Sequence, residues 1–290
     1  MAIYNKIGSI LATAYSADGT EISKAYDVFG SEAFSSVPIP NYNSYEFSTL
    51  GGTVGQGIAI YGNILARWDG STKLNLYTLS PFKSKAVVDT GESSHGNDAS
   101  FSDEFYSAAD DLPLIYIDSN LCFRIYKDGS TWTSTLIRKI TTPNVYGMKI
   151  AAGFDGNTLI TIGYSENQYT YSATNKLIIA KWDMTELTEN GNGTYTPALI
   201  STVTRDWLEC IQGASYHDGY LWVASGLGNT GNKGYVYALD VETGDIIYSI
   251  DTGSTNELEG LAWGYNETDN WYIVIGQTGF GFRKITFEYN

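Results

Sequence analysis

Charged residues are scarce in this sequence of 290 residues, and most of those present are acidic. Lys, Arg, Asp and Glu together make up 17% of the chain, and the formal net charge at pH 7 is −15. A surface of this sign repels the phosphates of nucleic acids and of anionic membranes. The chain also lacks an apolar run of the roughly 18 residues that a membrane helix needs. We therefore predict no nucleic-acid partner and no insertion into a membrane.

Cysteine and histidine are equally sparse, which removes most patterns of metal-binding and catalytic chemistry. Cys122 and Cys210 have no Cys or His neighbour at ligand spacing, so a zinc site is not indicated. We expect two buried free thiols, although a disulfide between them stays open. Of the two histidines, His217 lies in a Tyr-His-Asp-Gly stretch that is typical of a solvated turn. No G-x-S-x-G nucleophile elbow occurs, and no cofactor is predicted.

Aromatic residues and glycine are abundant instead, with 23 Tyr, 7 Trp and 31 Gly. Hydrophobic residues make up 43% of the chain, which is enough for a sizeable core. Stretches rich in Ala, Leu, Glu and Lys, which favour helices, are few. Aromatic strands interrupted by glycine-containing turns fit this composition better, and the sequence therefore predicts an all-β fold.

A polar residue followed by glycine recurs along the chain and opens successive segments of similar pattern. The glycines are about 40 to 65 residues apart, near the period of about 40–50 residues at which propeller blades repeat. Radial repetition also leaves only short, protected sheet edges. The recurring pairs are Gln56-Gly57, His95-Gly96, Gln212-Gly213 and Glu259-Gly260, with Tyr146-Gly147 as a looser member.

Each segment contains three or four candidate strands joined by tight turns, as a propeller blade requires. In the first segment the strands are expected at Ile64–Trp68 and Lys73–Leu79. The Asn- and Gly-rich stretch Glu186–Thr196 is expected to be a long loop. We predict a β-propeller of about five blades over residues 53–290.

A different, shorter repeat occupies the N-terminus. Tyr, Gly and Glu recur at equal spacing in the copies that begin at Tyr15 and Tyr26, and each copy is expected to form a hairpin. Two such copies bury little surface alone, so residues 1–34 are predicted to anchor the chain to another protein through Tyr15 and Tyr26, unless they are an ordinary β-extension. Residues 35–52, with Pro38 and Pro40, are expected to be a linker.

Two resemblances follow from these patterns. The stretch 211–263, with its Gln-Gly and Glu-Gly openings and its Asp-Val-Glu-Thr-Gly turn, resembles blades of glutaminyl cyclotransferase-type five-bladed propellers. This similarity covers about a fifth of the chain and implies the fold more than an activity. The N-terminal repeat joined to a propeller is similar in pattern to virion proteins of phages of gut bacteria, such as tail fibres and attachment proteins, which implies location in a virion.

The residues that open the blades are the main candidate site. If the innermost strands begin alike, these side chains form a ring at one mouth of the central channel, where propeller ligands usually bind. The alternative is that they satisfy main-chain groups between blades. The predicted ring consists of Gln56, His95, Tyr146, Gln212 and Glu259.

Other candidates are weaker. Trp132, Tyr169 and Tyr171 are predicted as exposed aromatic residues that stack on sugars. A clustering of Asp98, Asp103, Asp110 and Asp111 offers oxygen ligands for Ca²⁺ but lacks the D-x-D-x-D-G pattern, so no metal is predicted. If the protein is an enzyme, Glu259 and Glu209 are the candidate catalytic pair.

From the sequence we predict a non-enzymatic structural protein of a phage particle, a tail- or capsid-associated fibre or receptor-binding component. Its partners would be other virion proteins, bound through the N-terminal segment, and a host surface glycan. Two alternatives stay open. One is a propeller cyclotransferase, lyase or hydrolase acting at the channel mouth, and the other is an extracellular or cell-surface binding module of a bacterium.

Overall fold

The computed structural model describes residues 24–26, 32–35, 42–52, 55–166, 175–207, 210–226, 233–266, 270–278 and 281–289. Its regular elements over these residues are strands. The chain divides into two compact units, residues 45–287 and residues 1–44 together with 288–290. Within the described residues, no helix has the length and apolar character needed to cross a membrane.

Twenty of the strands form five groups of four neighbouring strands. In the first blade, β4 (Ile58–Tyr61), β5 (Ile64–Trp68), β6 (Lys73–Leu79) and β7 (Phe82–Asp89) pair in this order. The second contains β8 (Ala99–Phe101), β9 (Ile115–Ile117), β10 (Leu121–Asp128) and β11 (Thr131–Ile140). The third contains β12 (Tyr146–Asp155), β13 (Thr158–Tyr164), β14 (Lys176–Gly191) and β15 (Thr194–Asp206). The fourth contains β16 (Ile211–His217), β17 (Tyr220–Ser225), β18 (Tyr235–Asp240) and β19 (Ile246–Asp251).

The fifth group is completed by a strand from the other end of the chain. It contains β20 (Leu258–Asn266), β21 (Asn270–Gln277) and β22 (Gly281–Tyr289), followed by β3 (Tyr42–Gly51) as its outermost strand. Much of the predicted linker 35–52 is therefore a blade strand, and this prediction was wrong. Closing the last blade with an early strand leaves no gap between the two chain ends in the ring of sheets.

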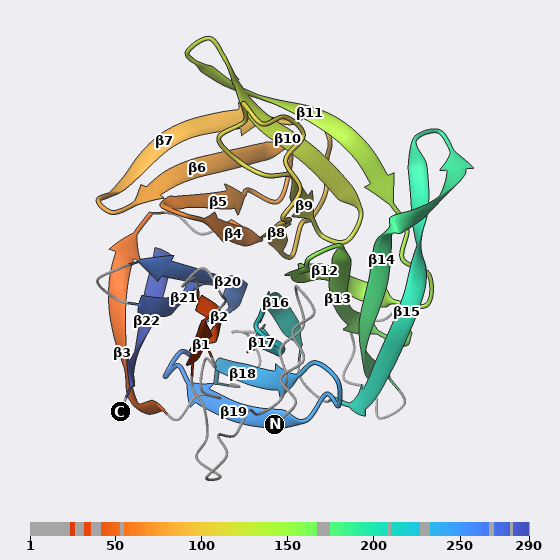
Figure 1. Ribbon diagram of the computed structural model, residues 1–290. Coiled ribbons are helices and arrows are strands. Elements are labelled where there is room, and N and C mark those ends of the chain that lie inside the picture. Colours follow the sequence, from red (N-terminus) through yellow and green to blue (C-terminus); the bar gives the residue numbers. More distant parts are fainter. Residues whose placement is uncertain are drawn as a thin grey trace. The chain divides into compact units, whose positions relative to one another are not determined.

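The innermost strands β4, β8, β12, β16 and β20 contact one another in this cyclic order, and β20 contacts β4. The sheets therefore surround a central channel, with β7, β11, β15, β19 and β3 on the outside (Figure 1). The all-β propeller predicted from the sequence is confirmed, and five four-stranded groups agree with about five blades. A short parallel pairing of β11 with β15, at Lys139 and Ile140, joins the second and third blades.

The turns between strands follow the residues that the sequence places there. The β16–β17 turn holds Asp218 and Gly219 at φ of 51° and 85°, the left-handed region that glycine and aspartate tolerate best. The predicted loop Glu186–Thr196 was wrong, because β14 and β15 continue as a long hairpin that turns at Asn192 and Gly193 (Figure 1). Residues 192 and 193 form a two-residue Asn-Gly turn, with φ of 54° and 69°.

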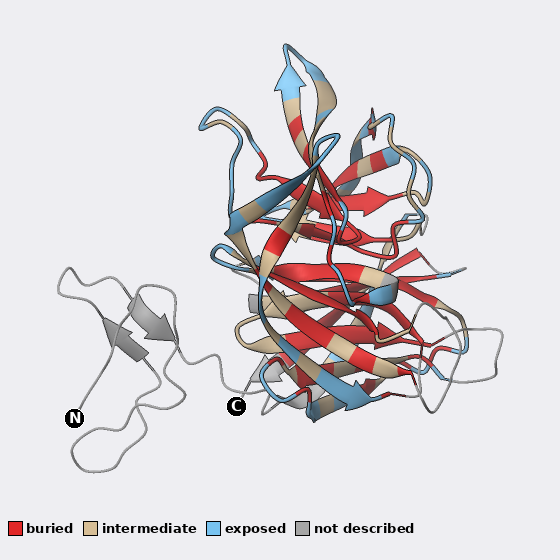
Figure 2. Ribbon diagram, turned by 90° about the vertical axis from the view of Figure 1, so that its right-hand side faces the viewer, coloured by how far each residue is buried: buried red, intermediate tan, exposed pale blue. Residues whose placement is uncertain are grey.

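The core lies between adjacent sheets, and buried residues concentrate on the inner strands (Figure 2). Three tryptophans fill these spaces from the second or third strand of a blade, namely Trp68, Trp182 and Trp222. Each is at most 2% exposed. Packing of large aromatic side chains between sheets keeps the blades at a fixed separation, so the channel is lined by rigid strands.

The smaller unit contains a separate pair of strands. β1 (Lys24–Tyr26) pairs antiparallel with β2 (Glu32–Ser35), with Tyr26 opposite Glu32. These strands belong to the second copy of the N-terminal repeat, whose expected pairing they show. Tyr15 and the first copy lie outside the described residues, and the side chain of Tyr26 is not described.

Candidate functional site at the channel mouth

The innermost strands approach one another so closely at their first residues that only glycine fits. A Cβ atom on Gly213 would lie 2.5 Å from Cα of Gly260, and one on Gly260 would lie 2.8 Å from the carbonyl oxygen of Gln56. Main-chain atoms cannot move aside as a flexible side chain can. The glycines of the recurring polar-Gly pairs therefore allow neighbouring blades to touch, and they form the floor of the channel mouth.

Asp98 occupies the corresponding position in the second blade and reaches across the channel. A Cβ atom on Gly57 would lie 2.4 Å from Cα of Asp98, which places this aspartate where other blades carry glycine. Its Oδ1 accepts hydrogen bonds from the N–H groups of Ile58 (3.3 Å) and Ala99 (2.9 Å). Its Oδ2 accepts one from the N–H of Ala214 in β16, a strand that is not a neighbour of β8.

The Asp98 carboxyl group thus joins three blades at the channel axis and is 0% exposed. Burial raises the pKa of Asp98 well above its usual range, while the N–H donors act in the opposite direction. Through these contacts Asp98 cross-links the blades inside the protein and closes the channel below the mouth.

Above this floor, two carboxyl groups meet two carboxamides. Glu259 in β20 is 7% exposed, and its side chain is hydrogen-bonded to that of Gln56. Gln212 in β16 is 5% exposed and donates from Nε2 to Oε1 of Glu257. Burial raises the pKa of Glu259 to about 8; the charge of Glu257 adds to this and the Gln56 hydrogen bond opposes it. Glu259 is therefore mostly protonated at neutral pH.

The thiol of Cys210 lies beside these groups and is not a nucleophile. Its Sγ is 4.0 Å from Oε1 of Gln212. Burial raises the pKa of Cys210 to about 12, and the charges of Glu257 and Glu259 add to the effect. Since the thiolate is the reactive form, this cysteine is inert at neutral pH. Cys122 and Cys210 are both free and buried, as predicted.

The structure brings together three of the five residues in the predicted ring, Gln56, Gln212 and Glu259. His95 and Tyr146 are exposed, and no contact with these three is recorded over the described residues. In the second blade Asn97 takes the place of His95, because it precedes Asp98 as Gln56 precedes Gly57, and it is 6% exposed. Sequence reasoning missed Asn97 and Glu257.

In the second blade the polar-Gly pair His95-Gly96 does not stand at the channel mouth, and the segment before β8 shows why. Gly96 faces the indole of Trp68, since a Cβ atom there would lie 2.2 Å from Cδ1, so this glycine serves packing within the first blade. Asp118 fixes the same segment by accepting hydrogen bonds from Oγ of Ser94 (2.7 Å) and the N–H of Asn97 (2.8 Å). His95 is consequently directed to the surface.

The remaining candidates that the structure describes have partners elsewhere. Glu209, Tyr169 and Tyr171 lie outside the described residues. Trp132 is half-buried and packs against the core, with Nζ of Lys127 5.0 Å from its ring centroid. The weak metal candidates have separate partners: Asp103 accepts from the N–H of Gly156, Asp110 pairs with Arg124 at 2.7 Å, and Asp111 pairs with Lys127. Over the described residues, no group of His, Cys, Asp or Glu has the arrangement of a metal site.

His217 is not the solvated turn residue that its sequence context predicts. Its ring lies 4.8 Å from that of Trp263 and 4.0 Å from that of Trp271, measured between centroids. Its Nε2 atom is buried without a hydrogen-bond partner among the described residues. Burial lowers the pKa of His217 to about 4. The flanking tryptophans come from β20 and β21 of the next blade. The sequence around His217 gives no indication of these contacts.

Replacement of His217 with phenylalanine is expected to reduce the acid sensitivity of the protein. The native state holds this imidazole neutral to a pKa of about 4, whereas the unfolded chain protonates it near 6.5. The contribution of His217 to stability is therefore lost as the pH falls from 6.5 towards 4. Phenylalanine keeps the aromatic packing, and the variant should be more stable than wild type by about 1–3 kcal/mol near pH 4.5.

Urea denaturation at several pH values measures this difference, with the exposed His95 changed to glutamine as a control. Parallel pH profiles for wild type and the His217 variant would contradict the burial of the neutral imidazole.

Comparison with known proteins yields similarities in fold. No family model matches the chain, and no curated protein sequence matches it. Glutaminyl cyclase of Myxococcus xanthus is similar at 13% identity, over 86% of this chain and 96% of that chain, with a TM-score of 0.48. The β-propeller domain of Cps50 (Swd1) from Myceliophteria thermophila is similar at 9% identity, over 86% and 100%, with a TM-score of 0.40. BamB from Moraxella catarrhalis is similar at 19% identity, over 79% and 62%, with a TM-score of 0.30. At these values we draw no functional argument from the similarities.

Proposed function

We propose that the protein is a non-enzymatic binding protein and that its channel mouth receives a cationic group of a partner protein. The observation that carries this proposal is the pair of hydrogen-bonded couples, Gln56 with Glu259 and Gln212 with Glu257, above the glycine floor. Their side chains come from different blades, so the fold holds them in place before a ligand arrives. Preformed concave sites with a few convergent polar groups are typical of ligand binding.

The chemistry of the mouth favours a ligand that donates hydrogen bonds and carries positive charge. Carboxyl and carboxamide oxygens accept hydrogen bonds, and an ammonium group has three donors and no acceptor. A bound cation also favours the ionised form of Glu259, whose pKa is about 8 in the free protein. Binding should therefore release a proton at neutral pH, and the affinity should rise as the pH approaches and passes 8.

NMR titration with Nα-acetyl-lysine methylamide tests this, with the norleucine analogue as the uncharged control. We expect binding in the millimolar range that is at least about fivefold tighter at pH 8.5 than at pH 6. Glu259→Gln should remove the pH dependence, while Glu189→Gln, a change to an exposed carboxylate of the β14–β15 hairpin, should leave it intact. Equal binding of both analogues, or binding without pH dependence, would refute a cation site at Glu259.

One observation favours the second candidate function, an enzyme that uses Glu259 as an acid and base. A carboxyl group with a pKa of about 8 is close to the value that suits proton transfer at neutral pH, and Glu257 supplies a second carboxyl group nearby. The raised pKa of Cys210 argues against covalent catalysis by this thiol at the channel mouth. Turnover of a small substrate that is lost in Glu259→Gln would replace the binding proposal with this one.

The role in a phage particle, with residues 1–34 attached to other virion proteins, rests on the resemblance in pattern of the N-terminal repeat joined to a propeller and stays a prediction. Mass spectrometry of purified particles, with this chain present or absent, tests it.

A further inference from the structure

The tip of the β14–β15 hairpin carries the two Asn-Gly dipeptides of the chain, one directly after the other. They are Asn190-Gly191 at the end of β14 and Asn192-Gly193 in the turn. In such a dipeptide the main-chain nitrogen of the glycine can attack Cγ of the asparagine, because glycine has no Cβ atom to hinder the approach. The attack closes a succinimide ring and releases ammonia. What surrounds each pair therefore decides which asparagine reacts.

The turn leaves the reacting atoms of Asn192-Gly193 free. Both residues are exposed, and a Cβ atom on Gly193 would meet nothing within 4 Å. The N–H of Gly193 has no hydrogen-bond partner among the described residues, and the carboxamide of Asn192 has none there either. Water reaches this pair, and its nitrogen and carboxamide can meet without first breaking a hydrogen bond of their own.

Asn190 precedes this pair and is held in place. Its Nδ2 atom donates a hydrogen bond to Oγ1 of Thr196 at 2.7 Å. Gly191, whose nitrogen would have to attack, is a strand residue paired with Thr194. A reaction at Asn190 must therefore break the side-chain bond and open the end of the hairpin. The two Asn-Gly pairs share their sequence and their exposure but differ in what fixes them.

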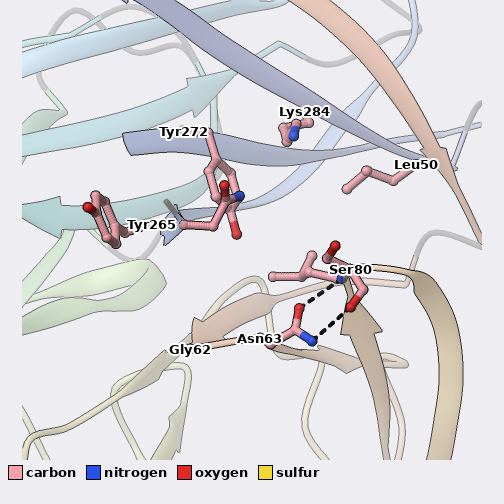
Figure 3. Close-up of a pocket in the computed structure, with 9 residues that line it drawn as sticks. Leu50, Gly62, Asn63, Ser80, Tyr265, Tyr272 and Lys284 are labelled. Atoms are coloured by element: carbon pink, nitrogen blue, oxygen red, sulfur yellow. Dashed lines mark hydrogen bonds between the residues drawn. The ribbon is translucent and has the colours of Figure 1, made fainter. Parts of the chain in front are cut away.

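Asn63 shows how an exposed turn asparagine is protected elsewhere in the protein. It lines the cavity shown in Figure 3, where its carboxamide is bonded at both ends. Oδ1 accepts from the N–H of Ser80 at 2.8 Å, and Nδ2 donates to the carbonyl oxygen of Ser80 at 3.1 Å. The next residue is Ile64, whose branched side chain shields the main-chain nitrogen. Asn63 is therefore an internal reference that should not react.

The tip also carries the contact between the second and third blades. The carbonyl oxygen of Gly193 accepts a hydrogen bond from the N–H of Lys139 in β11 at 3.0 Å. The carbonyl oxygen of Tyr195 accepts one from the N–H of Thr141 at 2.8 Å. Water opens a succinimide at either carbonyl, giving aspartate or isoaspartate, and in isoaspartate the main chain is one atom longer. A turn lengthened in this way displaces the carbonyl group of Gly193 from Lys139.

From this arrangement we propose that Asn192 is a site of spontaneous deamidation and that isoaspartate at this position detaches the hairpin tip from β11. First the nitrogen of Gly193 bonds to Cγ of Asn192, the bond from Cγ to Nδ2 breaks, and ammonia leaves with the proton of the main-chain nitrogen. Water then adds to one carbonyl of the ring, and the bond from that carbonyl to the ring nitrogen breaks. This reaction is independent of the function proposed for the channel mouth.

Peptide mass spectrometry of the full chain, aged at mildly alkaline pH, tests the first part of the proposal. Fragmentation that distinguishes isoaspartate from aspartate identifies the products. We expect deamidation at Asn192 to be about tenfold or more faster than at Asn190, and none at Asn63. Thr196→Val removes the acceptor that holds Asn190. It should raise the rate at Asn190 by about threefold or more and leave the rate at Asn192 unchanged.

Hydrogen exchange at the N–H groups of Lys139 and Thr141 tests the second part. We expect about fivefold or more faster exchange in molecules that carry isoaspartate at position 192. Asn192→Asp adds the same charge without lengthening the main chain, so its exchange should match that of the unmodified protein. The proposal is overturned if Asn190 reacts as fast as Asn192, if Asn192 reacts no faster than Asn63, or if the isoaspartate form exchanges as slowly as the unmodified protein.

Discussion

Replacement of Asp98 with alanine is expected to lower the free energy of unfolding by about 3 kcal/mol. The carboxyl group accepts hydrogen bonds from the main-chain N–H groups of Ile58, Ala99 and Ala214, which belong to three different blades. Alanine leaves these three buried donors without acceptors, at about 1–3 kcal/mol each. It also removes a carboxyl group whose burial raises its pKa and opposes folding, so the net loss is smaller than the three bonds together.

Denaturation in urea at neutral pH measures this loss, and Asp128→Ala, a change to the exposed last residue of β10, is the matched control. The control should stay within about 0.5 kcal/mol of wild type. If Asp98→Ala lowered the stability no more than the control does, Asp98 would not join the blades across the channel. The description of a channel that Asp98 closes below the mouth would then be incorrect.

Replacement of Glu259 with glutamine is expected to stabilise the protein by about 2–4 kcal/mol near pH 9 and to have little effect near pH 4. The native state keeps this carboxyl group protonated up to about pH 8, while the unfolded chain releases the proton near pH 4.5. The favourable contribution of Glu259 is therefore complete below pH 4.5 and is lost as the pH rises through 8. Glutamine has the shape of the protonated acid and can keep a hydrogen bond to Gln56 without that loss.

The size of this effect follows from the change in pKa. One pKa unit corresponds to about 1.4 kcal/mol, and partial access of solvent to the mouth reduces the full value. Thermal or urea unfolding of wild type and variant across this pH range gives the difference directly, with Glu189→Gln as the control. A difference that does not grow with pH would mean that Glu259 is an ordinary, solvated carboxylate.

The repeating part of the fold could be predicted from the sequence because it depends on local chemistry. Strands β5 and β6 begin and end where the alternation of apolar residues and the turn glycines place them. The β14–β15 hairpin was missed because Asn and Gly were counted as loop formers. The two-residue Asn-Gly turn at 192 and 193, which favours a tight hairpin, was a signal that could have found it.

The closing strand β3 could not be found in the same way. It pairs with β22, which lies at the other end of the chain, and such pairing depends on how the ring closes. Residues 42–51 also follow two prolines, which favoured a linker.

For the site, too, residues that follow a local sequence pattern were predicted, and residues that depend on packing between blades were not. The polar-Gly pairs identified Gln56, Gln212 and Glu259, because each glycine is required where two blades touch. The second blade broke the pattern, since Asp98 stands at the glycine position and Gly96 serves the packing of Trp68. The tryptophans around His217 come from the next blade, and their proximity is visible only in the assembled structure, whereas Glu257, two residues before Glu259, was open to sequence reasoning.

The most direct test of the channel-mouth site is the titration of Glu259 itself. Carboxyl ¹³C NMR of protein labelled at glutamate side chains, with Glu259→Gln to assign the signal, measures this pKa without a ligand. We predict titration near pH 8, well above the pKa of about 4.3 of an unperturbed glutamate. Titration of Glu259 near 4.5 would contradict a protonated carboxyl group at the channel mouth.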